Sequence, residues 1–124
     1  MAPESLTARL VTASRQLTAA VEAVLAAEQL TVDDWLVVEA LAGVDELAMT
    51  DLRARTLTSA PTLSRVVDRL ATRALLFREV DATDRRRVRL HLSKRGEALH
   101  RRVRPLVAEA EQAWSAARPA AEPV

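Results

Sequence analysis

Three kinds of residue are scarce in this sequence, and each scarcity excludes a class of protein. There is no cysteine, which excludes disulfide bonds, thiolate metal sites and cysteine redox chemistry. The chain has only two glycines, too few for a glycine-rich loop that cradles phosphate. Aromatic residues make up 2% of the chain, so leucine, valine and alanine must fill the core. Such a core favours helices packed on helices over a sheet sandwich.

Long apolar runs are absent as well. Charged residues interrupt every apolar stretch before the roughly 18 residues that a membrane span needs. The first ten residues, MAPESLTARL, lack the basic segment and apolar run of a secretory signal. We therefore expect a cytoplasmic protein without a membrane partner. Its length suits a single domain over residues 1–124.

The charges are distributed unevenly, although the net charge is only +1. Between Asp51 and Arg104 lie 15 of the 18 basic residues but only 6 of the 17 acidic residues. A segregated basic half is the expected footprint of a polyanion such as nucleic acid. The other interpretation is a solvated charged face.

Two long segments at the ends of the chain, 4–28 and 94–117, have helical periodicity. Their apolar stripes are narrow, as in coiled coils, so each helix is expected to pack against a partner helix. We predict that they are the dimerisation arms of a homodimer. The stripes consist of Leu6, Leu10, Ala13, Leu17, Val21 and Val24 in the first segment, and Leu99, Val103, Leu106, Ala110 and Ala113 in the second.

The segment 31–93 between the arms is predicted to hold three shorter helices and, at 47–49, a short extended segment. The first covers about 32–42. The second covers about 51–55, with Thr50 as its expected N-cap. The third covers 59–73, is capped by Ser59 or Thr58, and has a buried stripe. That stripe consists of Leu63, Val66, Val67 and Leu70.

The periodicity then changes from helical to alternating. In residues 76–80 and 88–92 the side chains follow a two-residue period, as in a strand with two different faces. This pattern predicts a β-hairpin with a basic tip. Ser93 is expected to cap the following helix. Two short helices followed by a basic hairpin form a winged helix-turn-helix, so the fold class is mainly α with a small β-hairpin wing.

The 59–73 helix has a polar front that can enter a major groove. Arg65 on this front could donate two hydrogen bonds to a guanine. The alternative is that Arg65 and Arg69 merely pair with Asp68 or with solvent. The arginines of the hairpin tip could enter a minor groove, where narrow A·T stretches attract them. These are Arg85, Arg86 and Arg87.

Three sequence runs resemble the MarR-type (multiple antibiotic resistance regulator) family: residues 59–70, 78–86 and 92–96. The resemblance covers roughly residues 31–100. It implies a homodimeric regulator, in most cases a repressor, that binds a pseudo-palindromic operator in double-stranded DNA. It also implies release of DNA when a small, often phenolic or anionic, effector binds.

The resemblance also assigns roles to individual residues. On the recognition helix, the DNA-binding residues would be Ser59, Pro61, Thr62, Ser64, Arg65 and Arg69. In the wing, Arg85 with Arg86 or Arg87 would enter the minor groove, while Asp84 would stabilise the wing as a salt-bridge partner.

The sequence departs from the family at several points. Ala74 stands where a glycine with positive φ usually ends the recognition helix, and the turn 56–58 lacks its usual glycine. The chain also ends soon after the 94–117 helix, where the family usually adds another helix to the dimer interface.

Other chemistry has little support in the sequence. His91 and His100 are the only histidines, and a metal site needs three or four convergent ligands, so we expect no metal, no cofactor and no catalytic residues. Trp35 could line an effector pocket, but a core position is the more common role for such a residue. The competing hypothesis for function is a winged-helix module that binds other proteins without binding DNA.

Overall fold

The computed structural model describes residues 4–118, and the chain divides into two compact units. The central unit comprises residues 33–103, and the terminal unit joins the segment up to Val32 with the segment from Arg104. Helix α5 (Lys94–Ala116) begins in the central unit and ends in the terminal unit. The central unit ends at Val103, which is fully buried on α5.

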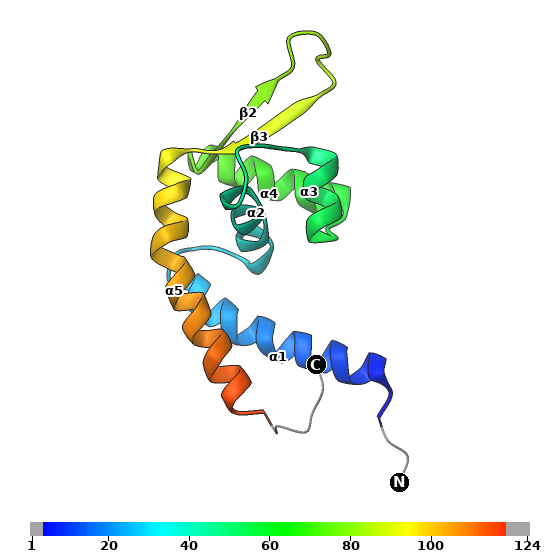
Figure 1. The fold of residues 1–124 in the computed structure, drawn as a ribbon, viewed down its shortest axis with the longest axis vertical. Helices are drawn as coiled ribbons and strands as arrows, with labels where there is room; N and C mark the ends of the chain where they lie inside the picture. Colours follow the sequence, from blue (N-terminus) through cyan, green and yellow to red (C-terminus); the bar gives the residue numbers. More distant parts are fainter. Residues whose placement is uncertain (1–3, 119–124) are drawn as a thin grey trace. The chain divides into compact units, whose positions relative to one another are not determined.

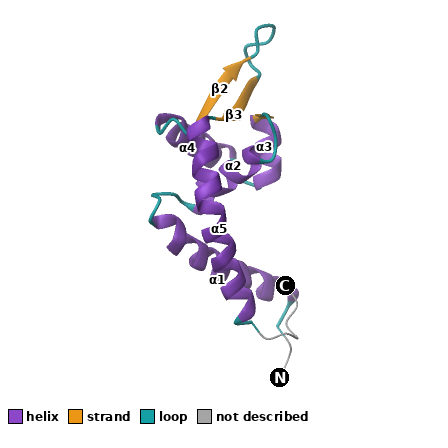
Figure 2. Cartoon of the chain, turned by 60° about the vertical axis from the view of Figure 1, so that its left-hand side comes forward, coloured by secondary structure: helices purple, strands orange, loops and turns teal. Residues whose placement is uncertain are grey.

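The central unit contains an antiparallel sheet of three strands in the order β1-β3-β2. The strands are β1 (Leu47–Ala48), β2 (Leu76–Val80) and β3 (Val88–Leu92). Strands β2 and β3 form a hairpin that projects from the helices, with the loop 81–87 at its end (Figures 1 and 2). We call this hairpin with its loop the wing. The predicted hairpin is therefore confirmed. Its core face consists of Leu76, Leu90 and Leu92.

Three helices pack with the sheet: α2 (Val32–Ala42), α3 (Met49–Thr56) and α4 (Ala60–Thr72). The predicted inner stripe of α4 is confirmed, since all four of its residues are at most 1% exposed. The expected cap at Thr50 is wrong. Helix α3 already begins at Met49, because the chain passes directly from the short strand β1 into the helix.

Two turns that lack glycine adopt the left-handed conformation nonetheless. Leu57 ends α3 with φ 52°, and Ala74 follows α4 with φ 59°. A residue with a Cβ atom loses about 1 kcal/mol in this conformation. The backbone amides after α4 offset part of this cost, because Ala74 N–H donates to the Ala71 carbonyl and Leu75 N–H to the Leu70 carbonyl, both at 2.9 Å.

The start of α5 is attached to the turn after α4. The Ser93 hydroxyl donates to the Ala74 carbonyl at 2.6 Å and accepts from Gly96 N–H at 3.0 Å. It therefore caps α5 as predicted. Gly96 lies so close to this turn that an added Cβ atom would be 2.0 Å from the Leu75 carbonyl oxygen. Only glycine fits at this contact.

The terminal unit contains α1 (Leu6–Ala26), capped by Ser5. Ala13 and Val21 of the predicted stripe are buried, whereas Leu6 and Leu10 at its start are 59% and 41% exposed. The terminal unit thus leaves part of an apolar stripe uncovered. Among residues 4–118, no helix combines the length and apolarity that crossing a bilayer requires.

Candidate nucleic-acid interface

The first turn of α4 is held by a chain of hydroxyl groups. Ser59 is the N-cap, and its hydroxyl oxygen accepts from Thr62 N–H at 3.4 Å while the hydroxyl itself donates to Thr62 Oγ1 at 3.0 Å. Pro61 lies in this turn, where its missing N–H leaves no acceptor unsatisfied. The helix therefore begins with a rigid turn that presents small polar groups to solvent.

Arg65 is attached to the same turn. Its Nη2 donates to Thr62 Oγ1 at 3.3 Å, so the guanidinium group lies along the exposed face of α4 beside Ser64. An arginine in this position keeps most of its donors available for an external acceptor. The alternative interpretation, in which Arg65 pairs with Asp68, does not hold, because Asp68 pairs with Arg78.

Arg69, which the sequence analysis placed on the DNA-binding face, is bonded to α2. Its Nη2 donates to Asp34 Oδ1 at 2.6 Å, and the Asp34 side chain is only 3% exposed. Burying a carboxylate requires such a partner. The Arg69 side chain remains 48% exposed, so it can contact a phosphate as well. Its main structural effect is to hold α4 against α2.

A second ion pair joins the exposed face of α4 to the wing. Asp68 on α4 accepts from Arg78 on β2, and both side chains are largely exposed. Exposed pairs contribute little to stability, but this one couples the orientation of the helix to that of the hairpin. Asp68 therefore pairs with Arg78 rather than with the arginines of its own helix that the alternative interpretation named.

The tip of the wing carries three arginines with different surroundings. The Asp84 carboxylate accepts from Arg86 N–H at 3.0 Å and from Arg86 Nε at 3.3 Å, and it lies 3.8 Å from Arg87 Nε. Arg86 and Arg87 are nevertheless highly exposed, and Arg85 forms no ion pair with any residue in the range 4–118. The tip thus presents guanidinium groups to solvent on a loop that Asp84 organises.

Asp81 organises the other side of this loop, and the sequence analysis did not identify it. Its carboxylate accepts from the Thr83 hydroxyl and the Thr83 N–H, both at 2.8 Å, and lies 3.4 Å from Arg89 Nη2. The hydrogen bond from the Thr83 hydroxyl, followed by those from the Thr83 and Asp84 amides, lowers the pKa of Asp81 from 3.8 to about 2. An aspartate two residues before a threonine at the start of a loop is the signal for this turn.

A groove lies between the wing and the beginning of α3. Its volume is about 460 Å³, and it is lined by Ala48, Met49, Thr50, Arg86, Arg87, Val88 and Arg89. Three arginines therefore line this groove together with the first residues of a helix. Helix N-termini and arginines both favour phosphate oxygens. Its composition is therefore of the kind that favours a phosphate of a nucleic-acid backbone.

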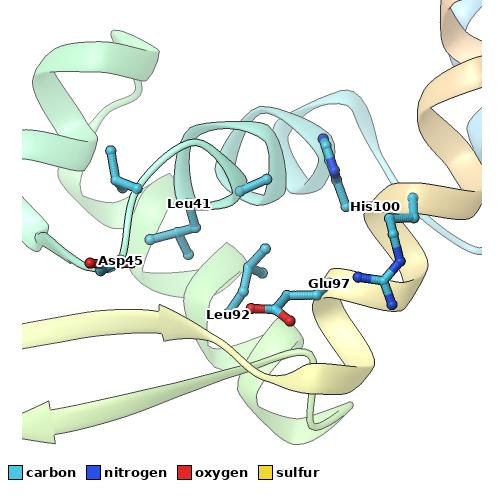
Figure 3. A pocket seen from close by; sticks show the side chains of 8 residues that line it. Leu41, Asp45, Leu92, Glu97 and His100 are labelled. Carbon is cyan, nitrogen blue, oxygen red and sulfur yellow. The ribbon is translucent and has the colours of Figure 1, made fainter.

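A smaller cavity of about 270 Å³ lies between the C-terminal end of α2 and the start of α5 (Figure 3). The side chains of Leu41, Glu97 and His100 line it. Trp35, the residue predicted for an effector pocket, is not part of this lining. It is buried and stacks on the His100 ring at 5.4 Å, so it supports the cavity wall from behind.

Comparison with known proteins identifies the central part of the chain. The family model described as MarR family matches residues 28–87, which include α2, α3, α4 and β2. No curated protein matches the sequence.

Three solved structures resemble the fold closely. A BpsR structure from Bordetella bronchiseptica is 26% identical, covers 96% of this chain and 90% of its own, and has a TM-score of 0.87. Apo MarR from E. coli is 17% identical over 97% of this chain and 89% of its own (TM-score 0.85). The S. aureus MepR–DNA complex is 20% identical over 95% and 88%, with a TM-score of 0.83. The winged helix-turn-helix fold predicted from the sequence is confirmed.

Proposed function

Residues 28–87 match the MarR family model, and on that premise we propose that this chain is a transcription regulator that binds double-stranded DNA sequence-specifically. In this proposal α4 enters the major groove and the wing enters the adjacent minor groove. The protein then acts by occupying DNA and has no catalytic residues.

One observation carries the proposal: two separate elements of the central unit each present oriented guanidinium groups to solvent. Arg65 is held on the exposed face of α4 by Thr62, and the loop that carries Arg85 is ordered by Asp84 and Asp81. The Asp68–Arg78 pair links the two elements. Oriented arginines bind base edges and phosphates at a smaller entropic cost than mobile ones.

The proposal includes a homodimer that represses transcription from a pseudo-palindromic operator. The partly exposed stripe of α1, with Leu6 and Leu10, and Leu106 on α5 at 45% exposure are suited to pack against a second copy of the chain. Two-fold symmetric proteins bind two half-sites about one helical turn apart. Because such a regulator acts on the chromosome, we expect it in the cytoplasm.

A small-molecule effector completes the proposal. In BpsR, one of the similar structures, DNA binding is regulated by 6-hydroxynicotinic acid. By analogy, a small effector would release this chain from its operator, with Trp35 beside the binding site. The cavity beside His100, at about 270 Å³, is near the lower limit of ligand-pocket volumes.

The site assignment is tested by measuring the affinity of variants for duplex DNA from upstream of the protein's own gene. Arg65→Ala and Arg85→Ala are each expected to weaken binding by about 1–3 kcal/mol, because each removes a base or groove contact. Arg101→Ala is the matched control, since this exposed arginine lies on α5 beside the cavity lined by Leu41.

Fluorescence anisotropy with a labelled duplex measures the affinities, and circular dichroism checks that each variant is folded. If Arg65→Ala and Arg85→Ala both bind as tightly as the unmodified protein, the assignment is wrong. A folded protein that binds no duplex at low salt would favour the competing hypothesis, a winged-helix module for protein contacts.

A further inference from the structure

Three potential metal ligands converge at the base of the wing, on the face of the sheet opposite the core. Glu46 precedes β1, Glu79 lies on β2 and His91 lies on β3. One ligand atom of each residue lies within 4.8 Å of the others. In the strand register Glu79 faces Arg89, so His91 is its diagonal neighbour on the same face. The loop before β1 and the strands β2 and β3 thus each supply one residue of this ligand cluster.

The tautomer of His91 is determined by its surroundings. Its Nδ1 lies 3.1 Å from the Asp45 carbonyl oxygen. A carbonyl oxygen can only accept, so Nδ1 carries the proton and donates it. In the neutral ring Nε2 then holds a lone pair. Phe77 stacks on the imidazole with ring centroids 4.8 Å apart and fixes its plane.

The Nε2 atom of the neutral ring is the feature that points to a ligand. It is buried and forms no hydrogen bond with any residue that the structure describes. It lies 3.6 Å from Glu46 Oε2 and 3.6 Å from Glu79 Oε2. These distances are too long for hydrogen bonds, and a lone pair that faces two carboxylates is electrostatically unfavourable unless a cation lies between them.

The two distances from His91 Nε2 to the carboxylates are close to those between ligands around a metal ion. With bonds of 2.0–2.2 Å, two ligands of a tetrahedral zinc are about 3.4 Å apart. We propose that Glu46, Glu79 and His91 form a binding site for a divalent transition-metal ion, with zinc as the best-fitting example. The Asp45 carbonyl supplies the outer hydrogen bond that a metal-binding histidine usually makes.

The ligand set determines which ions bind. One imidazole nitrogen and two carboxylates suit zinc and its neighbours in the first transition row, whereas magnesium prefers oxygen ligands and octahedral geometry. Three protein ligands leave a fourth position for water. Arg89 competes weakly for the site, because its Nε lies 3.9 Å from Glu46 Oε2 while its Nη2 contacts Asp81.

A metal at this position would link the loop before β1 to both strands of the wing. Because the ligands come from three segments that are brought together only by folding, the ion binds the native state preferentially and stabilises it by mass action. The site lies outside the proposed DNA contacts and does not depend on the proposed function.

The test is calorimetric titration of the untagged full chain with ZnCl₂ at neutral pH, with MgCl₂ as a second probe. We expect one Zn²⁺ per chain, an increase in the thermal unfolding midpoint, and no response to Mg²⁺. Glu79→Gln removes a ligand from a half-exposed side chain and should weaken Zn²⁺ binding by about tenfold or more.

Glu39→Gln provides the matched control, because Glu39 pairs with the other histidine, His100, at 2.8 Å. It should bind Zn²⁺ as the unmodified protein does. The proposal is overturned if the unmodified chain does not bind Zn²⁺, if Glu79→Gln binds it equally well, or if Glu39→Gln loses as much affinity as Glu79→Gln. Circular dichroism establishes that both variants are folded, so that a loss of Zn²⁺ affinity can be attributed to the substituted side chain.

Discussion

Asp81 and Thr83 determine the conformation of the wing loop at the scale of single residues. The aspartate accepts three hydrogen bonds from the loop, from Thr83 twice and from the Asp84 amide. These bonds stabilise the ionised carboxylate, which explains why the pKa of Asp81 is lowered to about 2. A charged Asp81 therefore helps to place the neighbouring arginines.

Removing the Thr83 hydroxyl should raise the pKa of Asp81. The hydroxyl makes the largest contribution to the shift, so in Thr83→Val the Asp81 carboxyl should titrate closer to its ordinary value of 3.8. Carbon-13 NMR of the carboxyl group measures the midpoint directly. Identical midpoints in the variant and the unmodified protein would refute this assignment.

The direction of the pH effect follows from the same shift. Because the folded pKa is below the unfolded value, the contribution of Asp81 to loop order is fully present above pH 3.8 and is lost as the pH falls toward 2. The amide signals of Thr83 and Asp84 should move over this range.

Contacts of single residues were the least predictable part of the site. Helical periodicity predicts the exposed face of α4 and places Arg65 on it. Ser59 could be predicted as the cap because serine favours the N-cap position. The bond between Arg69 and Asp34 could not be predicted, because the two residues are 35 positions apart and meet only through the packing of α4 on α2. The same reason explains why Glu46, Glu79 and His91 could not be recognised as a cluster.

At the scale of elements, the start of α5 packs closely against the turn after α4. Ser93 bonds to the carbonyl groups of Ala74 and Leu75 through its hydroxyl and its amide. Gly96, one turn into the helix, lies against the same turn. The helix can approach this closely only because position 96 has no side chain.

The two glycines of the chain make a matched pair for testing this contact. Gly96→Ala places a Cβ atom 2.0 Å from the Leu75 carbonyl oxygen, so it should lower the free energy of unfolding by about 2 kcal/mol or more. Gly43→Ala meets no atom within 4 Å and should change it by less than about 0.5 kcal/mol. Urea denaturation compares them; equal effects would contradict the contact.

Most elements could be predicted because their periodicities are strong. The stripe of α4 and the alternation of β2 and β3 each bury one face, which fixes both the type of element and its orientation. The boundary at Thr50 could not be predicted in this way. A short extended segment at 47–49 is expected from the sequence, but the residue at which it gives way to α3 is defined only by the pairing of β1 with β3.

At the scale of the whole molecule, the terminal unit is expected to join two chains. Light scattering at micromolar concentration should give a mass of roughly twice 13.6 kDa. A charge in the exposed stripe should dissociate the dimer, so Leu10→Glu should shift the mass toward the monomer, whereas Thr7→Glu outside the stripe should not. A monomeric unmodified protein would contradict this prediction.

The salt dependence of DNA binding tests most directly whether the central unit binds a duplex through the front of α4 and the tip of the wing. Phosphate contacts release counterions, so the logarithm of the association constant should fall with the logarithm of salt concentration with a slope of about −4 or steeper. Replacing Arg85, Arg86 and Arg87 together by alanine should reduce the steepness by about 2 or more. A slope near zero, or the same slope in this variant, would contradict the proposed mode of binding.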